Sequence, residues 1–154
     1  MFMTGESADP DVRTLIIGFS AAAESAARLL VRQGQPKRSI FLIARGAEQA
    51  LAAATLGLRS VTGIDTATIE RRLPRGLNRV IVDVEDDALS EELIRRLASR
   101  VPGALIVARA LLPGAVRRLI EAGAFQAFCD SSVAGRLLAA TAFPAPNSPP
   151  VVFH

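Results

Sequence analysis

The sequence predicts an α/β fold: a doubly wound, six-stranded parallel sheet with helices on both faces. Short apolar runs alternate six times with segments of helical period, the connections between them are short, and glycine or proline marks most of the switches. Alternation of this kind requires right-handed crossovers, so consecutive strands run parallel and the helices cover the sheet from either side.

The composition indicates one globular domain. The chain has 154 residues, half of them hydrophobic and 21% charged, which is enough for a core of its own. Trp and Tyr are absent, so we expect an aliphatic core with a few Phe. No apolar run approaches the ~20 residues of a membrane span, and the first fourteen residues lack the apolar segment of a signal peptide. The sequence therefore predicts a soluble, cytosolic protein.

The charges and the rare residues exclude several function classes. The net charge is +3, and the arginines alternate with acidic residues on the expected helices, which indicates solvated faces and no nucleic-acid partner. The single cysteine, Cys129, excludes an internal disulfide and a zinc cluster, and we interpret it as a small buried hydrophobe. The single histidine is His154, so neither a metal site nor a histidine-based triad is expected.

The first strand-turn-helix unit, residues 14–34, organises the chain. An apolar run at 15–17 predicts a buried strand, Gly18 breaks it, and a helical period follows. The residues expected on the buried side of that helix are Ala22, Ala26, Leu29 and Leu30. This geometry directs backbone N–H groups and the positive end of a helix dipole at one point, which suits a phosphate.

The glycine fingerprint of this unit is incomplete. The pattern G-x-G-x-x-G falls on Gly18, Ser20 and Ala23. Gly18 is either close to a phosphate or a simple strand-to-helix turn. Ser20 either donates its hydroxyl to a phosphate or fills the place of a glycine in a site that lost its ligand. Ala23 still permits close packing of helix and strand.

The rest of the chain repeats the alternation. Further strands are expected at residues 39–44, 59–62, 78–84, 104–108 and 125–129, and helices at 47–55, 66–72, 90–100, 113–123 and 133–142. The expected helix caps are Asp65, Ser90 and Ser131. The buried faces of the fourth and fifth helices are expected to carry Leu89, Leu93, Ile94 and Leu97, and Val116, Leu119 and Ile120.

The domain organisation follows from these elements. Residues 1–12 are expected to form a flexible leader, residues 13–143 one domain, and residues 144–154 a Pro-rich tail or cut linker. A reversal of strand order beside the first strand would open a crevice at the carboxyl ends, where ligands bind in open sheets.

Five segments carry a resemblance to a known family: 15–34, the turn at 63–66, the strand and acidic loop at 80–87, the strand at 105–110 with Arg109, and the ending at 119–124 and 133–139. In this order and spacing they resemble the N-terminal lobe of the RCK domain (regulator of conductance of potassium), also called the TrkA-N domain. That lobe is a Rossmann-like NAD-binding domain.

The resemblance implies a cytosolic, ligand-sensing regulatory domain of a potassium channel or potassium transporter, fused to or docked on the membrane-embedded subunit at the inner membrane. It implies a homodimer, often assembled into a ring, in which binding of a nucleotide or another anionic ligand shifts the assembly and gates the pore. The implied cofactor is NAD(H) or an adenine nucleotide. The positions that would contact it are Gly18, Phe19, Ser20, Ala21, Ala22, Arg45, Asp65, Thr66, Val84 and Arg109.

The chain departs from the family pattern at its second strand. The acidic residue that usually ends this strand and holds a ribose hydroxyl is here Ala44, followed by Arg45. Arg45 either meets a 2′-phosphate or another anion or is a solvated loop residue. Asp65 is either a helix cap or a ribose ligand, one position later than the family usually has its aspartate.

The fourth and fifth strands leave two interpretations open. Arg109 either contacts a ligand phosphate or forms an ion pair with an acidic residue, the candidates being Glu85, Asp86 and Asp87. Asp83 lies in an otherwise apolar strand and is either hydrogen-bonded near the crevice or faces a partner subunit.

Three functions are therefore in competition. The first is the ligand-gated regulatory domain. The second is a degenerate Rossmann module that serves only as an assembly scaffold without nucleotide, which the lost glycines and Ala44 favour. The third, an NAD(P)-dependent oxidoreductase, has the least support, because the chain offers no substrate domain and no proton donor near a nicotinamide. The sequence therefore does not predict an enzyme or a catalytic residue.

Overall fold

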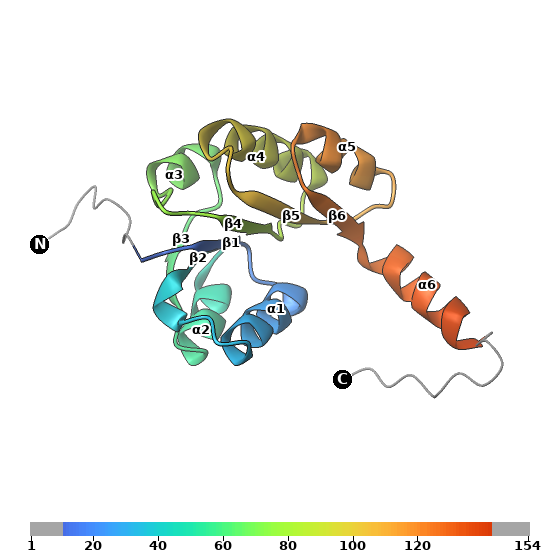
Figure 1. The fold of residues 1–154 in the computed structure, drawn as a ribbon, viewed down its shortest axis with the longest axis horizontal. Helices are drawn as coiled ribbons and strands as arrows, with labels where there is room; N and C mark the ends of the chain where they lie inside the picture. Colours follow the sequence, from blue (N-terminus) through green and yellow to red (C-terminus); the bar gives the residue numbers. More distant parts are fainter. Residues whose placement is uncertain (1–10, 143–154) are drawn as a thin grey trace, which may run out of the picture.

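The computed structural model describes residues 11–142 and contains the predicted six-stranded parallel sheet, in the order β3-β2-β1-β4-β5-β6 (Figure 1). The strands are β1 (Thr14–Ile17), β2 (Ile40–Ala44), β3 (Arg59–Thr62), β4 (Arg79–Val82), β5 (Leu105–Ala110) and β6 (Gln126–Cys129). The chain builds outward from β1 to β3 and then returns to the other side of β1, so the order reverses beside β1. The predicted fold class is confirmed.

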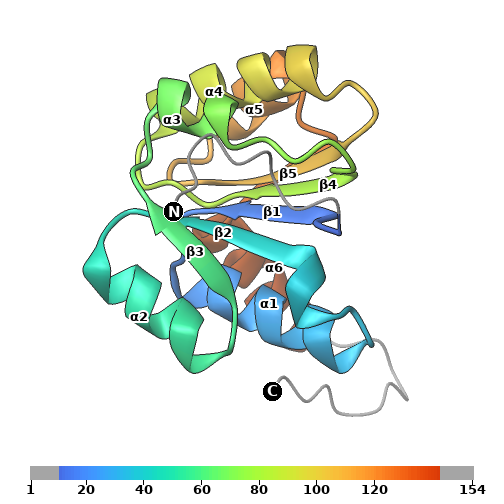
Figure 2. The same cartoon turned by 90° about the vertical axis from the view of Figure 1, so that its left-hand side faces the viewer.

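The helices form a layer on each face of the sheet. Figure 2 shows one layer made by α1 (Ala21–Arg32) and α2 (Ala47–Thr55), and the other by α3 (Thr66–Arg71), α4 (Asp87–Arg100) and α5 (Ala115–Ala122). A short 3-10 helix, η1 (Lys37–Ser39), precedes β2. The last helix, α6 (Asp130–Ala142), projects away from both layers (Figure 1). No helix formed by residues 11–142 combines the length and the hydropathy that crossing a membrane requires.

The core consists of two apolar layers that share the central strands. Every residue of β1 is buried, since helices cover it on both faces. The layer against α3, α4 and α5 contains Leu15, Ile17, Val82, Leu93, Ile94, Leu97 and Leu119, among others. The layer against α1 and α2 contains Ile16, Phe19, Ala23, Ala27, Leu42 and Ala53, among others.

The strands β4, β5 and β6 are buried on one face only. Buried and partly exposed residues alternate along each of them, and the buried set points to α4 and α5. The other face carries partly exposed side chains, among them Ile81, Val107 and Phe128. The helix layer of α1 and α2 therefore leaves this half of the sheet open.

The predicted buried face of α1 is wrong. Ala23 and Ala27 are the buried residues of this helix, at 2% and 0% exposure, whereas Leu29 is 53% exposed. Ala22 is exposed, and Ala26 and Leu30 are only partly buried. Helix and sheet approach closely through small side chains, so the leucines lie at the flanks of the contact.

The predicted start of α4 is also wrong. The helix begins at Asp87, and Asp86 is its cap, accepting a hydrogen bond from the N–H of Leu89 at 3.1 Å. A carboxylate four residues after the end of β4 thus satisfies the helix donors one turn earlier than Ser90 could. Ser90 lies inside the helix, fully buried, and its hydroxyl has no partner among the described residues.

Two smaller expectations about the last helices also fail. Ile120 of α5 is 43% exposed, so of the three predicted residues only Leu119 and the partly buried Val116 face the core. Helix α6 starts at Asp130, immediately after β6, so Ser131 lies within the helix and does not cap it. The end of α5 at Gly123 is as predicted, with a φ of 130°.

The two chain ends lie mostly outside the described residues. The expected leader is described only at its last two residues, of which Val12 is 1% exposed. The expected tail and Phe143 fall outside residues 11–142.

Candidate functional site at the glycine turn

The predicted turn lies at the carboxyl end of β1, where the neighbouring strand comes very close. Gly18 has a φ of 84°, and a Cβ built on it would lie 2.0 Å from the backbone oxygen of Asp83. Only glycine fits this backbone without a shift. The turn and the close approach of β4 therefore explain Gly18 without any ligand.

The side chain of Asp83 lies at the amino end of α1. Its Oδ2 accepts a hydrogen bond from the backbone N–H of Ser20 at 2.9 Å and another from the Ser20 hydroxyl. Its Oδ1 accepts a hydrogen bond from Nε of Arg109. The carboxylate is 2% exposed. A buried anion thus occupies the point at which the sequence predicts a phosphate, and of the two interpretations of Asp83 the hydrogen-bonded one is correct.

Arg109 joins two acidic residues. Its guanidinium, 13% exposed, pairs with Asp83 and, through Nη1, with Asp130 at 3.3 Å. Burial by itself lowers the pKa of Arg109, but the hydrogen bond and the charge of Asp83 outweigh it, and Asp130 adds to them, so the pKa is raised. Arg109 therefore forms an ion pair, as one of its two interpretations expected. Its partners are Asp83 and Asp130 and not the expected candidates, which were Glu85, Asp86 and Asp87.

The register of the sheet brings these groups together. Ile17 pairs with Val82, and Val82 pairs with Ala108. One residue further along each strand, Gly18, Asp83 and Arg109 form the next row at the carboxyl edge. Asp130 joins them because α6 starts directly after β6.

Several other backbone donors around the turn also have partners within the chain. Gly18 donates to the carbonyl of Ile43 at 2.8 Å, and the N–H of Ala22 donates to Oγ of Ser20 at 3.2 Å. The N–H groups of Phe19 and Arg45 both donate to Oε1 of Gln49, at 3.1 and 2.8 Å. Sequence reasoning missed Gln49, whose only signal is a polar residue on the Ala-rich α2, four residues after Arg45.

Arg45 and Asp65 both have partners within the chain. Arg45 pairs with Glu85 at 2.7 Å, with side chains 60% and 52% exposed. Asp65 caps α3, accepting from the backbone N–H of Thr68 at 2.8 Å and from its hydroxyl at 2.7 Å. The backbone hydrogen bond from Thr68 is the main reason why the pKa of Asp65 is lowered.

A cavity of ≈ 220 Å³ opens beside the turn. Of the ten predicted contact positions, Gly18, Arg45 and Val84 line it. Ala21 and Ala22 are exposed at the start of α1, and Thr66 starts α3. The cavity is smaller than the ~300–1,000 Å³ of usual small-molecule sites. Its walls include three acidic residues, Asp83, Glu85 and Asp86, against the single cation Arg45.

These observations test whether a nucleotide fits. A pyrophosphate at the turn requires backbone N–H groups without partners and a wall that tolerates negative charge. The N–H groups of Gly18, Phe19, Ser20 and Ala22 already have partners, and the charged residues of the cavity wall are three acidic side chains and one arginine. Ala44 offers no carboxylate to a ribose. The residues present do not fit a dinucleotide bound in this way.

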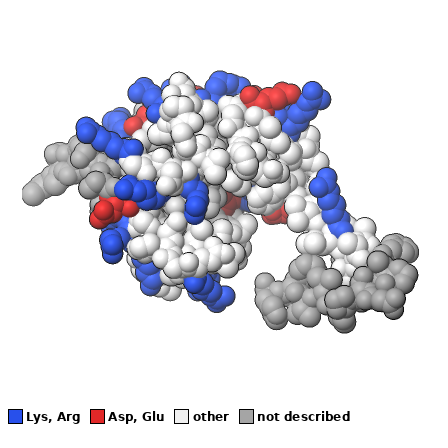
Figure 3. Space-filling view, in the orientation of Figure 1, with Lys and Arg blue, Asp and Glu red and all other residues white. Residues whose placement is uncertain are grey.

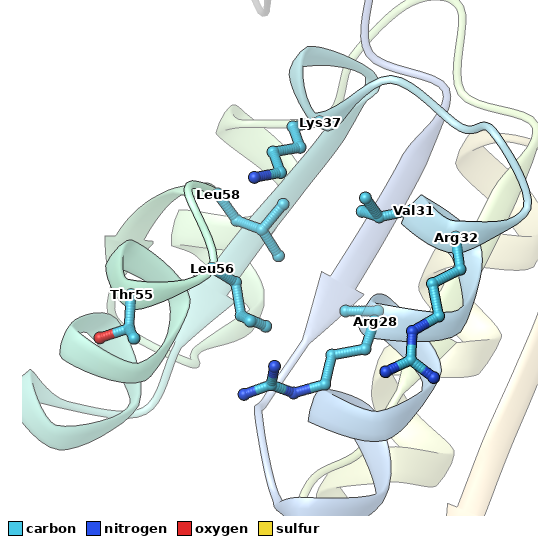
Figure 4. A pocket seen from close by; sticks show the side chains of 8 residues that line it. Arg28, Val31, Arg32, Lys37, Thr55, Leu56 and Leu58 are labelled. Carbon is cyan, nitrogen blue, oxygen red and sulfur yellow. The ribbon is translucent and has the colours of Figure 1, made fainter.

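Another cavity, of ≈ 240 Å³, lies between the carboxyl ends of α1 and α2 (Figure 4). Figure 4 shows Val31, Leu56 and Leu58 between the two helices, with the cations Arg28 and Lys37 on opposite sides. Cations are favourable at the carboxyl end of a helix without any ligand. Figure 3 shows that Lys and Arg side chains are spread over both helical layers on the face in view and do not form a single patch.

The sheet order, the glycine turn and the two helical layers define a Rossmann-type α/β domain. A comparison with solved structures shows which domains of this type the chain resembles. The TrkA-N domain of the inner membrane protein ybaL from Escherichia coli has a TM-score of 0.72 and 17% identity, over 82% of this chain and 93% of that one. The GsuK RCK domain has a TM-score of 0.70 and 25% identity, over 88% of this chain. The resemblance to TrkA-N and RCK domains is confirmed over most of the chain.

The comparison also includes nucleotide-bound structures. The GsuK channel bound to NAD has a TM-score of 0.72 and 19% identity, over 90% of this chain. The present chain spans only 24% of that chain and 29% of the GsuK RCK domain chain. No protein-family model and no curated protein sequence matches the chain significantly.

An enzyme is among the more distant similar structures. Prephenate dehydrogenase from A. aeolicus, in complex with hydroxyphenyl propionate and NAD+, has a TM-score of 0.56 and 19% identity, over 75% of this chain and 40% of that one. At this identity the likeness shows the fold alone. The more similar structures include the TrkA-N and RCK domains and the NAD(P)-binding domain of an exopolyphosphatase-related protein from Archaeoglobus fulgidus, which has a TM-score of 0.69 and 18% identity, over 83% of this chain and 95% of that one.

Proposed function

We propose that the chain is a cytosolic regulatory domain of a potassium channel or transporter at the inner membrane, and that it acts as a homodimer. The likeness to the ybaL TrkA-N domain and the GsuK RCK domain supports the class of function. The observation that carries the dimer is a pair of apolar surfaces, one on α6 and one on the sheet, that no other part of residues 11–142 covers.

Helix α6 is the first surface. No residue of Asp130–Ala142 is buried, and Val133, Leu137 and Leu138 are 40%, 42% and 71% exposed. Figure 1 shows the helix extending away from the domain. A helix of this kind gains stability only when another surface covers its apolar side chains.

The open half of the sheet is the second surface. A hollow of ≈ 190 Å³ lies beside α1; its lining is mostly apolar, with Ala26, Ile81, Val107 and Phe128 among it, and the charged residues that also line it are Arg79, Asp83 and Arg109. Two copies that exchange α6 would cover the helix and the hollow of both copies at once. Such an isologous contact closes on itself, as expected for a twofold dimer.

The dimer predicts the effect of charges on α6. Replacing Leu137 and Leu138 together by Asp is expected to give a folded monomer, because both side chains are exposed in the single domain and lie on the surface that we place in the interface. Sedimentation equilibrium measures the mass. Leu51→Asp is the matched control, since Leu51 is 70% exposed on α2, away from both surfaces. A wild-type monomer at high concentration, or a dimer that survives the α6 change, would contradict the proposal.

The glycine turn bears on how the domain regulates. Gating by a nucleotide or another anionic ligand requires a place for it near Gly18, Ser20 and Arg45. The hydrogen bonds of Asp83 and Gln49 to the turn favour the other mode, an assembly module that works without nucleotide. We therefore place regulation in the contact between two copies.

The potassium role has its own test. Deleting the gene in its own organism is expected to change the uptake or efflux of rubidium, a tracer for potassium, and re-expression of the wild-type protein should restore it. The Leu51→Asp variant should also restore the flux, whereas the Leu137→Asp/Leu138→Asp variant should not. An unchanged rubidium flux after deletion would refute the potassium role and leave the dimer to be judged by its mass.

A further inference from the structure

We propose that the carboxylate of Asp83 takes the place of a ligand phosphate at the amino end of α1, so that the chain itself closes its glycine turn to nucleotides. Asp83 then determines which ligands the domain accepts, because it keeps nucleotides out of the turn. This inference goes beyond the proposed function and does not depend on which transport protein the domain serves, because it concerns ligand binding by the domain alone.

The donors around Asp83 are those that a phosphate would use. They are a backbone N–H at a helix amino end, the hydroxyl of Ser20 and the guanidinium of Arg109. Both carboxylate oxygens are engaged, and the side chain is 2% exposed. A carboxylate and a phosphate oxygen cannot share these donors, so a nucleotide could bind only by displacing Asp83.

Displacement is unfavourable for two reasons. Asp83 is attached to β4, so its effective concentration at the turn far exceeds any cellular concentration of a free nucleotide. A displaced carboxylate would also lose its partner Arg109 while still in the protein interior. A nucleotide must overcome both of these costs before it gains any contact at the turn.

The neighbouring acidic residues have other roles, so Asp83 can be tested by itself. Glu85 pairs with Arg45, Asp86 caps α4, and Asp87 accepts hydrogen bonds from the N–H groups of Leu111 and Leu112 at 2.8 and 3.1 Å. Glu85 also lines the cavity beside the turn. Glu85→Gln therefore removes a negative charge from the same cavity without vacating the position of the phosphate.

Ser20 is the competing explanation for a closed site. Ser20→Gly restores the second glycine of the fingerprint but leaves the carboxylate of Asp83 in place. If the serine closes the turn, this variant alone should bind nucleotides. If Asp83 closes it, only variants without the carboxylate should bind.

Calorimetric titration with ADP and with NAD separates these cases. The wild type, Glu85→Gln and Ser20→Gly are expected to show no saturable binding at millimolar ligand. Asp83→Ala and the double variant Asp83→Ala/Ser20→Gly are expected to bind at least one of the two nucleotides roughly 10-fold to 100-fold more tightly than the wild type, the range for hydrogen bonds to charged groups. Arg109 keeps Asp130 as a partner in both variants.

Several outcomes would overturn the inference: a wild type that binds as tightly as Asp83→Ala, binding by Ser20→Gly alone, an equal gain in Glu85→Gln, or a folded Asp83→Ala that binds neither nucleotide. Asp83→Ser serves as a second variant with a shorter side chain. If neither Asp83 variant folds, the wild type decides: the amide NMR signal of Ser20 should stay unchanged as ADP is added, and a saturable shift would refute the proposal. None of these measurements involves potassium transport. A failure of this inference can therefore be told apart from a failure of the proposed regulatory function.

Discussion

Replacing Arg109 by Met is expected to destabilise the protein by roughly 3–5 kcal/mol, because it leaves a buried carboxylate without its cationic partner. Asp83 is 2% exposed, and its bonds to Ser20 supply no compensating positive charge. Chemical denaturation followed by circular dichroism measures the free energy of unfolding. The denaturant concentration at the unfolding midpoint should fall. The slope m should stay the same, because the overall fold and the buried area are unchanged.

Arg117→Met is the matched control for this change. Arg117 pairs with Glu121 within α5, with side chains 89% and 62% exposed. A pair of this kind contributes about 0–1 kcal/mol, so the control should unfold almost as the wild type does. Equal losses in the two variants would mean that Asp83 and Arg109 do not form the buried pair described above.

Replacing Gly18 by Ala is expected to cost about 3 kcal/mol or more, from overpacking together with a left-handed backbone. The added Cβ would meet the backbone oxygen of Asp83 at 2.0 Å, and a backbone atom cannot move aside as a flexible side chain can. Thermal and chemical unfolding both report this loss. No ligand is needed for it, because the clash lies between two strands of the protein itself.

Gly114→Ala is the matched control for the glycine turn. Gly114 has a φ of −67°, and a Cβ built on it meets nothing within 4 Å. Alanine in such a conformation stabilises by about 0.4–1 kcal/mol through the unfolded state. A Gly18→Ala variant as stable as the wild type would show that the end of β4 can yield, and the structural explanation of Gly18 would fail.

Local patterns in the sequence predicted the parts of the fold that depend on neighbouring residues. The alternation of strands and helices, the turn at Gly18, the Asp65 cap and the end of α5 at Gly123 all follow from residues within one or two turns of one another. The same reasoning failed at α4, where two capping residues, Asp86 and Ser90, stood one turn apart. Only the path of the chain after β4 chose between them.

The contacts at the turn could not be read from local patterns. Asp83 and Ser20 are 63 residues apart in the chain, and Arg109 and Asp83 are 26 apart. Their meeting depends on the order of the strands and on a register that a single-residue slip would change. The sequence did mark Asp83 as unusual, since a charged residue in an apolar strand needs a partner.

The sequence by itself therefore determined the fold class, the position of the glycine turn and the family that the chain resembles. Periodicity and turn chemistry are properties of short segments, so they can be recognised before the chain is folded. Only the tertiary structure decided that the turn is filled by Asp83 and that, within the described part of the chain, no helix covers α6 or one face of half of the sheet. Both are decided by which distant segments lie side by side, and that arrangement exists only once the sheet has formed.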